Sequence, residues 1–158
     1  MDISYDTGNK RFNYRVCAVI ISGGRILAMR DERSPYYYLP GGRVRLGETA
    51  QAAVLREVEE ELEESLPIIR PLWFVQSFFN EDVNKLDYHE ICLYFLMDAA
   101  GSKLEGRGDA FTLYEREHTH RFEWLEFERL KDEYFYPNFM KTEVFDLPEE
   151  LKMIVEYE

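Results

Sequence analysis

The chain has 158 residues, of which 46% are hydrophobic and 15% aromatic, enough to close one substantial core. Two ordinary domains would need a longer chain, so we expect a single domain over residues 1–158. The net charge of −12 opposes nonspecific binding to duplex nucleic acid or to an anionic membrane, because both require clustered Lys and Arg.

The first 14 residues are polar, and no apolar run is long enough to span a membrane. We therefore expect a cytoplasmic protein with no membrane partner. Cys17 and Cys92 each lie inside an apolar run, where a free cysteine behaves as a small hydrophobic residue. Their number and spacing predict neither a disulfide framework nor a zinc site.

The first half of the chain alternates between strand patterns and turns. Residues 14–21 are rich in β-branched side chains, residues 22–24 (Ser-Gly-Gly) signal a turn, and residues 25–30 resume the apolar pattern. This order predicts a β-hairpin. Residues 36–39 predict a short aromatic strand that stops at the following Pro-Gly-Gly turn, residues 40–42.

Residues 49–65 predict a helix, because they contain helix formers throughout and neither Gly nor Pro. Thr49 is suited to cap its N-terminus, and Pro67 prevents continuation at the other end. Four apolar residues share one predicted face. They are Ala52, Leu55, Val58 and Leu62.

The second half predicts further strands at residues 72–79, 90–97 and 122–127. Residues 128–134 and 147–155 have helical patterns, the latter with Pro148 at an early helical position. Strands and helices in this order favour an α/β fold with a mixed sheet.

The predicted central helix is rich in glutamate: six of the eight residues from 57 to 64 are Glu. Glu57, Glu60 and Glu61 stand at positions i, i+3 and i+4, so they share one face, which we expect to point outward, opposite the apolar face. Like charges at this spacing repel one another, and a Mg²⁺ ion with oxygen ligands would offset that repulsion. A solvated acidic face is the alternative for a helix taken alone. The preceding Gly41-Gly42 turn favours the metal, because its carbonyls can point at an ion.

The spacing of these residues matches a longer pattern. Gly42 is followed after five residues by Glu48, then after seven by Arg56-Glu57, and then by Glu60-Glu61. In this pattern the chain resembles the Nudix (MutT-like) hydrolase family. It departs at Glu63 and Glu64, where the family has Gly and an apolar residue, which affects the end of the helix more than the chemistry.

The resemblance implies a Nudix fold, with a mixed sheet sandwiched between helices (α/β/α), and a Mg²⁺-dependent hydrolase, with Mn²⁺ as an alternative metal. It implies metal binding by Glu57, Glu60, Glu61 and the Gly41 carbonyl, and bracing of the loop against the helix by Glu48 and Arg56. The resulting catalytic candidates are Arg56, Glu57, Glu60, Glu61 and Glu117. The candidates for contact with substrate are Arg30, Gly42 and Glu48.

Two of these candidates have alternatives. Family members often take a further carboxylate from the loop before the last strand, which here holds Glu115 and Glu117; we favour Glu117, although ordinary loop charge explains it as well. Arg30 ends a strand near the Gly-Gly turn, where it can contact phosphate or remain solvated. Aromatic residues suited to stacking on a base, or to the core, are Tyr36, Tyr37, Tyr38, Phe78 and Phe79.

The resemblance leaves the substrate open among nucleoside diphosphate derivatives such as ADP-ribose, dinucleoside polyphosphates, nucleotide sugars and nucleoside triphosphates. Residues 89–97 and 135–158 resemble small members of the ADP-ribose pyrophosphatase-like group. A homodimer is a further expectation. Two other functions on the same fold are a noncatalytic nucleotide-sensing module and an isoprenoid diphosphate isomerase. The intact acidic pattern disfavours the first, and the structural setting of Cys17 and Cys92 disfavours the second.

Overall fold

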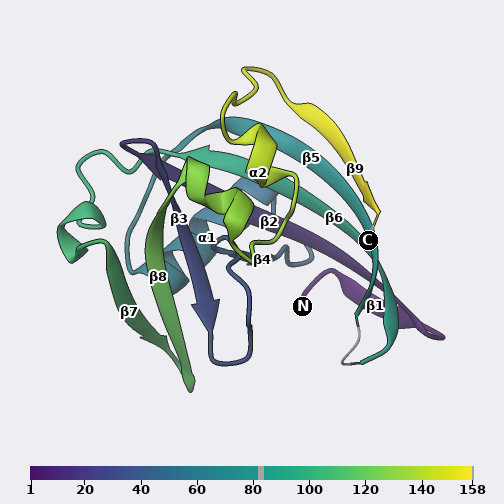
Figure 1. Cartoon of the computed structure of the whole chain (residues 1–158). Coiled ribbons are helices and arrows are strands. Elements are labelled where there is room, and N and C mark those ends of the chain that lie inside the picture. Colours follow the sequence, from purple (N-terminus) through teal and green to yellow (C-terminus); the bar gives the residue numbers. More distant parts are fainter. Residues whose placement is uncertain (82–83, 158) are drawn as a thin grey trace.

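A computed structural model describes residues 1–81 and 84–157 (Figure 1). Within these residues the strands form one sheet in the order β7-β8-β3-β2-β6-β5-β9, and β1 and β4 both pair with β2. The strands are β1 (Ser4–Thr7), β2 (Lys10–Ser22), β3 (Arg25–Asp31), β4 (Gly41–Arg43), β5 (Ile68–Glu81), β6 (Leu86–Met97), β7 (Ala110–Glu115), β8 (His118–Glu126) and β9 (Lys152–Tyr157). Parallel pairs (β2 with β6, β5 with β9) occur beside antiparallel ones, so the sheet is mixed, as predicted.

Helices cover both faces of this sheet (Figure 1). They are α1 (Ala50–Leu62), η1 (Glu105–Arg107), η2 (Phe127–Asp132) and α2 (Met140–Glu143). One core cluster joins α1 to alternate residues of the central strands, such as Val16 and Leu27. The other joins η2 and α2 to the residues in between, such as Cys17 and Ala28. This layering confirms the expected α/β/α arrangement. No helix of the described residues is long and apolar enough to cross a membrane.

Three predicted elements differ from the structure. Residues 147–155 are not helical: the chain forms β9 from Lys152 onward, parallel to β5, because its alternating side chains suit the sheet edge. In place of the helix predicted for residues 128–134, the chain forms the shorter 3-10 helix η2, which ends at Asp132. Residues 36–39 make only isolated bridges, and the regular strand β4 instead begins inside the predicted turn, at Gly41.

The helix α1 begins as predicted, with the Thr49 hydroxyl accepting a hydrogen bond from the Ala52 amide at 3.0 Å. Its predicted apolar face was wrong in phase, because Ala52 and Leu55 are exposed. The side chains that pack on the sheet are instead Ala50, Ala53, Val54, Val58, Glu61 and Leu62. The prediction that all three acids point outward is therefore wrong for Glu61, which lies on the packed face and is only 7% exposed.

The two glycines of β4 permit a close approach of three segments. A Cβ atom on Gly41 would overlap the Val16 carbonyl oxygen and stand 2.9 Å from the Cα of Cys17, both on β2. A Cβ atom on Gly42 would overlap the carboxylate of Glu57 on α1. Glycine at these positions lets β4 lie against β2 while α1 packs over it.

Replacing Gly41 with Ala should lower the free energy of unfolding by about 1–3 kcal/mol, because the new methyl group meets backbone atoms that cannot move independently. Urea denaturation measures this change. Gly106→Ala in η1 is the matched control, since no atom lies within 4 Å of its Cβ position, and it should change stability by less than about 0.5 kcal/mol. Equal stability of the two variants would contradict this account of β4.

Candidate active site

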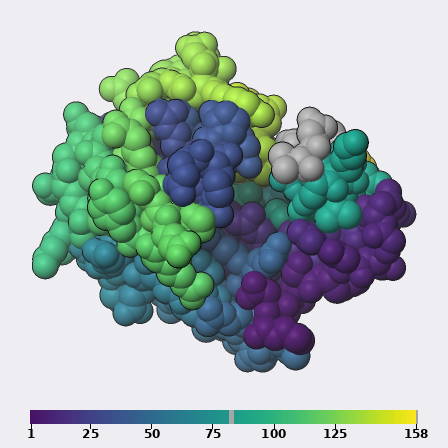
Figure 2. Space-filling model, turned by 90° about the horizontal axis from the view of Figure 1, so that it is seen from below, coloured from purple at the N-terminus to yellow at the C-terminus, as the bar shows by residue number. Residues whose placement is uncertain are grey.

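A cavity of about 480 Å³ opens between α1, β4 and the turn that joins β7 to β8. The residues that line it are Arg33, Gly41, Glu57, Glu61, Glu115, Arg116, Glu117, His118 and His120. In the space-filling view a hollow lies between residues 31–40 (dark blue), the β7–β8 turn (green) and the N-terminal strands (purple) (Figure 2). Segments far apart in the sequence therefore meet at one depression.

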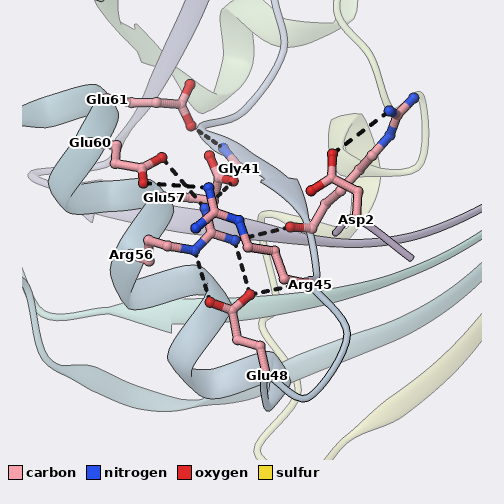
Figure 3. A network of polar contacts seen from close by, with 9 residues as sticks. Asp2, Gly41, Arg45, Glu48, Arg56, Glu57, Glu60 and Glu61 are labelled. Atoms are coloured by element: carbon pink, nitrogen blue, oxygen red, sulfur yellow. Dashed lines mark hydrogen bonds and ion pairs between the residues drawn. The ribbon is translucent and has the colours of Figure 1, made fainter. Parts of the chain in front are cut away.

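The loop between β4 and α1 is fixed by Arg56 (Figure 3). Its Nε and Nη2 atoms donate to the two carboxylate oxygens of Glu48 at 2.8 and 2.9 Å, and Nη2 also donates to the Arg43 carbonyl at 3.1 Å. The remaining nitrogen, Nη1, donates to Glu57 at 2.8 Å and to Glu60 at 3.4 Å. One guanidinium thus positions both the loop and two acids of the helix.

Glu57 and Glu61 carry negative charge into a poorly solvated place. Burial raises the pKa of Glu61 well above its usual value, and the charges of Glu57 and Glu115 raise it further, while a hydrogen bond from the Gly41 amide at 2.9 Å opposes the rise. Burial also raises the pKa of Glu57, against the effect of Arg56. The described protein groups therefore leave the charge of these carboxylates incompletely compensated.

These residues fit a hard divalent cation. Among the described residues, no three His, Cys, Asp or Glu side chains are grouped closely enough to form a complete metal site. Mg²⁺ needs no such cage, because it usually binds one or two carboxylates together with water and substrate phosphates. Glu57, Glu61 and Gly41 line the cavity and supply oxygen donors of this kind.

The structure separates Glu60 from the other two acids of the pattern. The Glu60 side chain is 41% exposed and faces Arg56 and Arg45 (Figure 3). The Nη2 atom of Arg45 lies 3.9 Å from a carboxylate oxygen of Glu60. Glu60 does not line the cavity, which Glu57 and Glu61 do. One helical face thus presents its acids to two different surroundings.

Arg30 also lies outside the group that lines the cavity. Its guanidinium stands 4.8 Å from the centre of the Tyr37 ring, a cation–π contact. Alternation along β3 turns Arg30 to the face opposite Met29, which packs toward α1. Arg33, which the sequence analysis did not single out, lines the cavity instead and pairs with Asp31 at 2.6 Å.

The β7–β8 turn brings two carboxylates to the cavity. Glu115 lies 3.3 Å from Nε2 of the buried His120, and its charge raises the pKa of both Glu57 and Glu61. Glu117 is exposed on the same turn. His118 and His120 also line the cavity, and no sequence signal predicted this. The turn between β7 and β8 contains no Gly, Pro or Asn, so the hairpin that aligns these residues has no turn signal.

The Glu48–Arg56 pair should make stability depend on pH. Arg56 lowers the pKa of Glu48 to about 2, so the carboxylate stabilises the fold fully above its ordinary pKa and loses this effect as the pH falls toward 2. Glu48→Gln should reduce the free energy of unfolding by about 1–2 kcal/mol at pH 7. The deficit should shrink as the pH is lowered from about 5.

Urea denaturation of both proteins between pH 7 and pH 3 tests this dependence. Glu59→Gln is the control, because Glu59 lies on the same helix with an exposed side chain. It should change stability by less than about 0.5 kcal/mol at either pH. A deficit for Glu48→Gln that stayed constant across this range would show that charge pairing with Arg56 is not its cause.

Comparisons with known proteins identify the family. A model of the NUDIX domain matches residues 11–142. The ADP-ribose pyrophosphatase of Methanocaldococcus jannaschii is 33% identical over 98 residues, which are 60% of this chain and 56% of that protein. The aligned stretch thus spans little more than half the length of this relative.

Solved structures share the fold at low sequence identity. A Nudix hydrolase from Nitrosomonas europaea superposes with a TM-score of 0.57 at 17% identity, over 85% of this chain and 86% of that one. A MutT protein from Bacillus halodurans gives 0.59 at 13% identity, over 92% and 90%. Since the domain match covers most of the sequence, the chain belongs to the Nudix family.

Proposed function

We propose that the protein is a Mg²⁺-dependent pyrophosphohydrolase that cleaves a phosphate anhydride in a nucleoside diphosphate linked to another moiety. The observation that carries this proposal is the pair Glu57 and Glu61, two carboxylates of raised pKa that face one cavity without a protein cation to neutralise them fully. The name of the M. jannaschii relative makes ADP-ribose the first substrate to test. Dinucleoside polyphosphates, nucleotide sugars and nucleoside triphosphates are the alternatives.

Glu57, Glu61 and the Gly41 carbonyl would hold the metal, with Mn²⁺ as an alternative to Mg²⁺. Glu60 would join them by turning away from Arg56. When bound, the metal would supply Lewis-acid chemistry, stabilising negative charge on the phosphate and making water a better nucleophile. Arg56 and Glu48 hold the helix and loop in register, and Gly42 leaves room for the Glu57 carboxylate.

The further carboxylate of the reaction comes from the β7–β8 turn. Glu117 is the residue favoured from the sequence, and it lines the cavity. Glu115 has the stronger support, because its charge acts on Glu57 and Glu61 and because His120 lies 3.3 Å from one of its carboxylate oxygens. We therefore propose that Glu115 orients the attacking water or adds a metal ligand, with Glu117 as the second candidate.

The direct test is incubation of the purified protein with Mg²⁺ and a panel of these substrates, with EDTA controls. Magnesium-dependent release of a nucleoside monophosphate from one class would support the proposal. Binding without turnover across the panel would favour the nucleotide-sensing module. The homodimer and the cytoplasmic location stay predictions, tested by light scattering and by cell fractionation.

Glu61→Gln should reduce turnover by more than roughly 100-fold, since it removes a charged ligand and keeps an oxygen that can accept from the Gly41 amide. The pKa of Glu61 is raised in the folded protein. Ionisation of Glu61 therefore lowers the free energy of unfolding as the pH rises above the ordinary pKa of a glutamate. The metal-free variant should therefore be at least as stable as the metal-free wild type at pH 8. Retained activity, or unfolding of the variant, would contradict the assigned role.

Glu115→Gln and Glu117→Gln distinguish the two carboxylates of the turn. We expect Glu115→Gln to lower kcat by roughly 10- to 1,000-fold with little change in KM, because it acts on the reacting groups rather than on binding. Glu117→Gln should lower kcat by less than about threefold, since its side chain is exposed. Steady-state kinetics with the best substrate of the panel measures both, and the reverse order would assign the role to Glu117.

A further inference from the structure

Arg15 is a charged residue whose position neither the core nor the carboxylate pair explains. It lies on β2, where it pairs with Arg43 of β4 on one side and with Cys92 of β6 on the other. Its Nε atom is buried and has no hydrogen-bond partner among the described residues. A buried donor without a partner in the protein is available to an acceptor from outside the chain, such as water or a ligand.

The pairing of β2 with β4 places Arg15 near the cavity, because Cys17, two residues further along the same face of β2, pairs with Gly41, which lines the cavity. Burial raises the pKa of Glu61, and the charge of Arg15 opposes that rise, so the guanidinium is within electrostatic reach of the cavity. It acts in the same way on the hydroxyl of Tyr36, in the segment of residues 31–40 that borders the hollow. The charge of Arg15 therefore acts both on a carboxylate of the acidic cavity and on this segment.

The protein does not saturate the guanidinium. Burial opposes the charge of Arg15, and nearby Glu90 raises its pKa again, so the side chain stays charged. Glu90 acts through its charge and not through a hydrogen bond, because its described partner is the Asn13 amide, 3.3 Å away. A guanidinium held in this way still presents donors in a planar fork that suits phosphate oxygens.

A series of aromatic rings begins at Tyr36. Tyr36 lies 6.3 Å from the ring of Tyr136, which lies 6.3 Å from Phe79, and Phe79 stacks on Tyr88 at 4.8 Å. Such a wall suits a nucleoside better than a bare phosphate, because a base or a ribose can lie against the ring faces. The described cation and the rings together fit a ligand that is anionic at one end and flat at the other.

We propose that Arg15 binds a phosphate of the nucleoside diphosphate substrate next to the acidic cavity, with the nucleoside against the aromatic rings that begin at Tyr36. The inference rests on the proposed function for the identity of the substrate. It adds a binding residue outside the acidic pattern and divides the work: Glu57 and Glu61 provide the metal side, and Arg15 provides a fixed positive charge. In a protein of net charge −12, that charge also favours the approach of an anion.

The experiment measures binding of ADP and of inorganic pyrophosphate by calorimetry, with Mg²⁺ and with EDTA. We expect Arg15→Gln to weaken ADP binding at least roughly tenfold in both conditions, because the charge and the fork are both lost. The ADP affinity of Arg15→Lys should fall between those of the wild type and Arg15→Gln. Arg25→Gln, which removes the same charge at a distant exposed ion pair with Asp109, should stay within about twofold of the wild type. ADP should bind the wild type more tightly than pyrophosphate does.

Unchanged ADP binding in Arg15→Gln, or no binding of ADP to the wild type in either condition, would overturn the proposal. Equal affinity for ADP and pyrophosphate would overturn the placement of the nucleoside. If Arg15→Gln does not fold, Arg15→Lys decides, because it keeps the charge opposite Glu90 and loses only the fork. Wild-type ADP affinity in that variant would contradict the proposal.

The inference and the proposed function fail separately. Loss of ADP binding in Arg15→Gln with no turnover by the wild type would leave Arg15 in place and refute the hydrolase. Turnover by Arg15→Gln with an unchanged KM would support the hydrolase and refute the role of Arg15. In the supported case KM rises at least roughly tenfold, and kcat changes less than KM, because the residue binds the substrate without touching the carboxylate pair.

Discussion

The contact of β4 with β2 at Gly41 is the constraint on which the site depends. Backbone atoms of β2 occupy the space that a side chain at position 41 would need. The same Gly41 offers its amide to Glu61, which ties the last turn of α1 to the edge of β4. The sheet, the helix and the acidic cavity thus share one point of close packing. A change there alters all three together, since close-packed interiors transmit strain.

Electrostatics explains why this packing is tolerable. The single positive charge of Arg56 is shared, because its donors are divided among Glu48, Glu57, Glu60 and one carbonyl. At Glu61, the described groups that oppose the rise in pKa are the Gly41 amide and the charge of Arg15. The local excess of negative charge is a property of the fold itself, and binding of a cation would relieve it. The unfavourable burial of the two carboxylates would therefore contribute to the metal affinity that we propose for this site.

The sequence predicts the elements whose signals are local. The cap at Thr49 and the strands of the first hairpin needed only turn chemistry and side-chain periodicity. The phase of α1 could not be read in the same way, because Val58 and Leu62 belong to both candidate faces and only packing on the sheet chooses between them. The edge strand β9 was not predicted for a similar reason: it pairs with β5, which is distant in sequence. Arg15 has no motif at all, and only strand pairing and burial distinguish it from a solvated arginine.

Glu63 ends α1 in the left-handed conformation, with φ of 57°, at the position where the family pattern has glycine. Its amide still closes the helix by donating to the Glu59 carbonyl at 3.1 Å, so the chain reaches the same geometry at a cost of about 1 kcal/mol in backbone strain. Glycine at this position lowers the backbone strain of the turn but is not required for it, whereas the acids one turn earlier are needed for their charge. A motif definition that demands this glycine would discard sequences whose metal-facing half is complete.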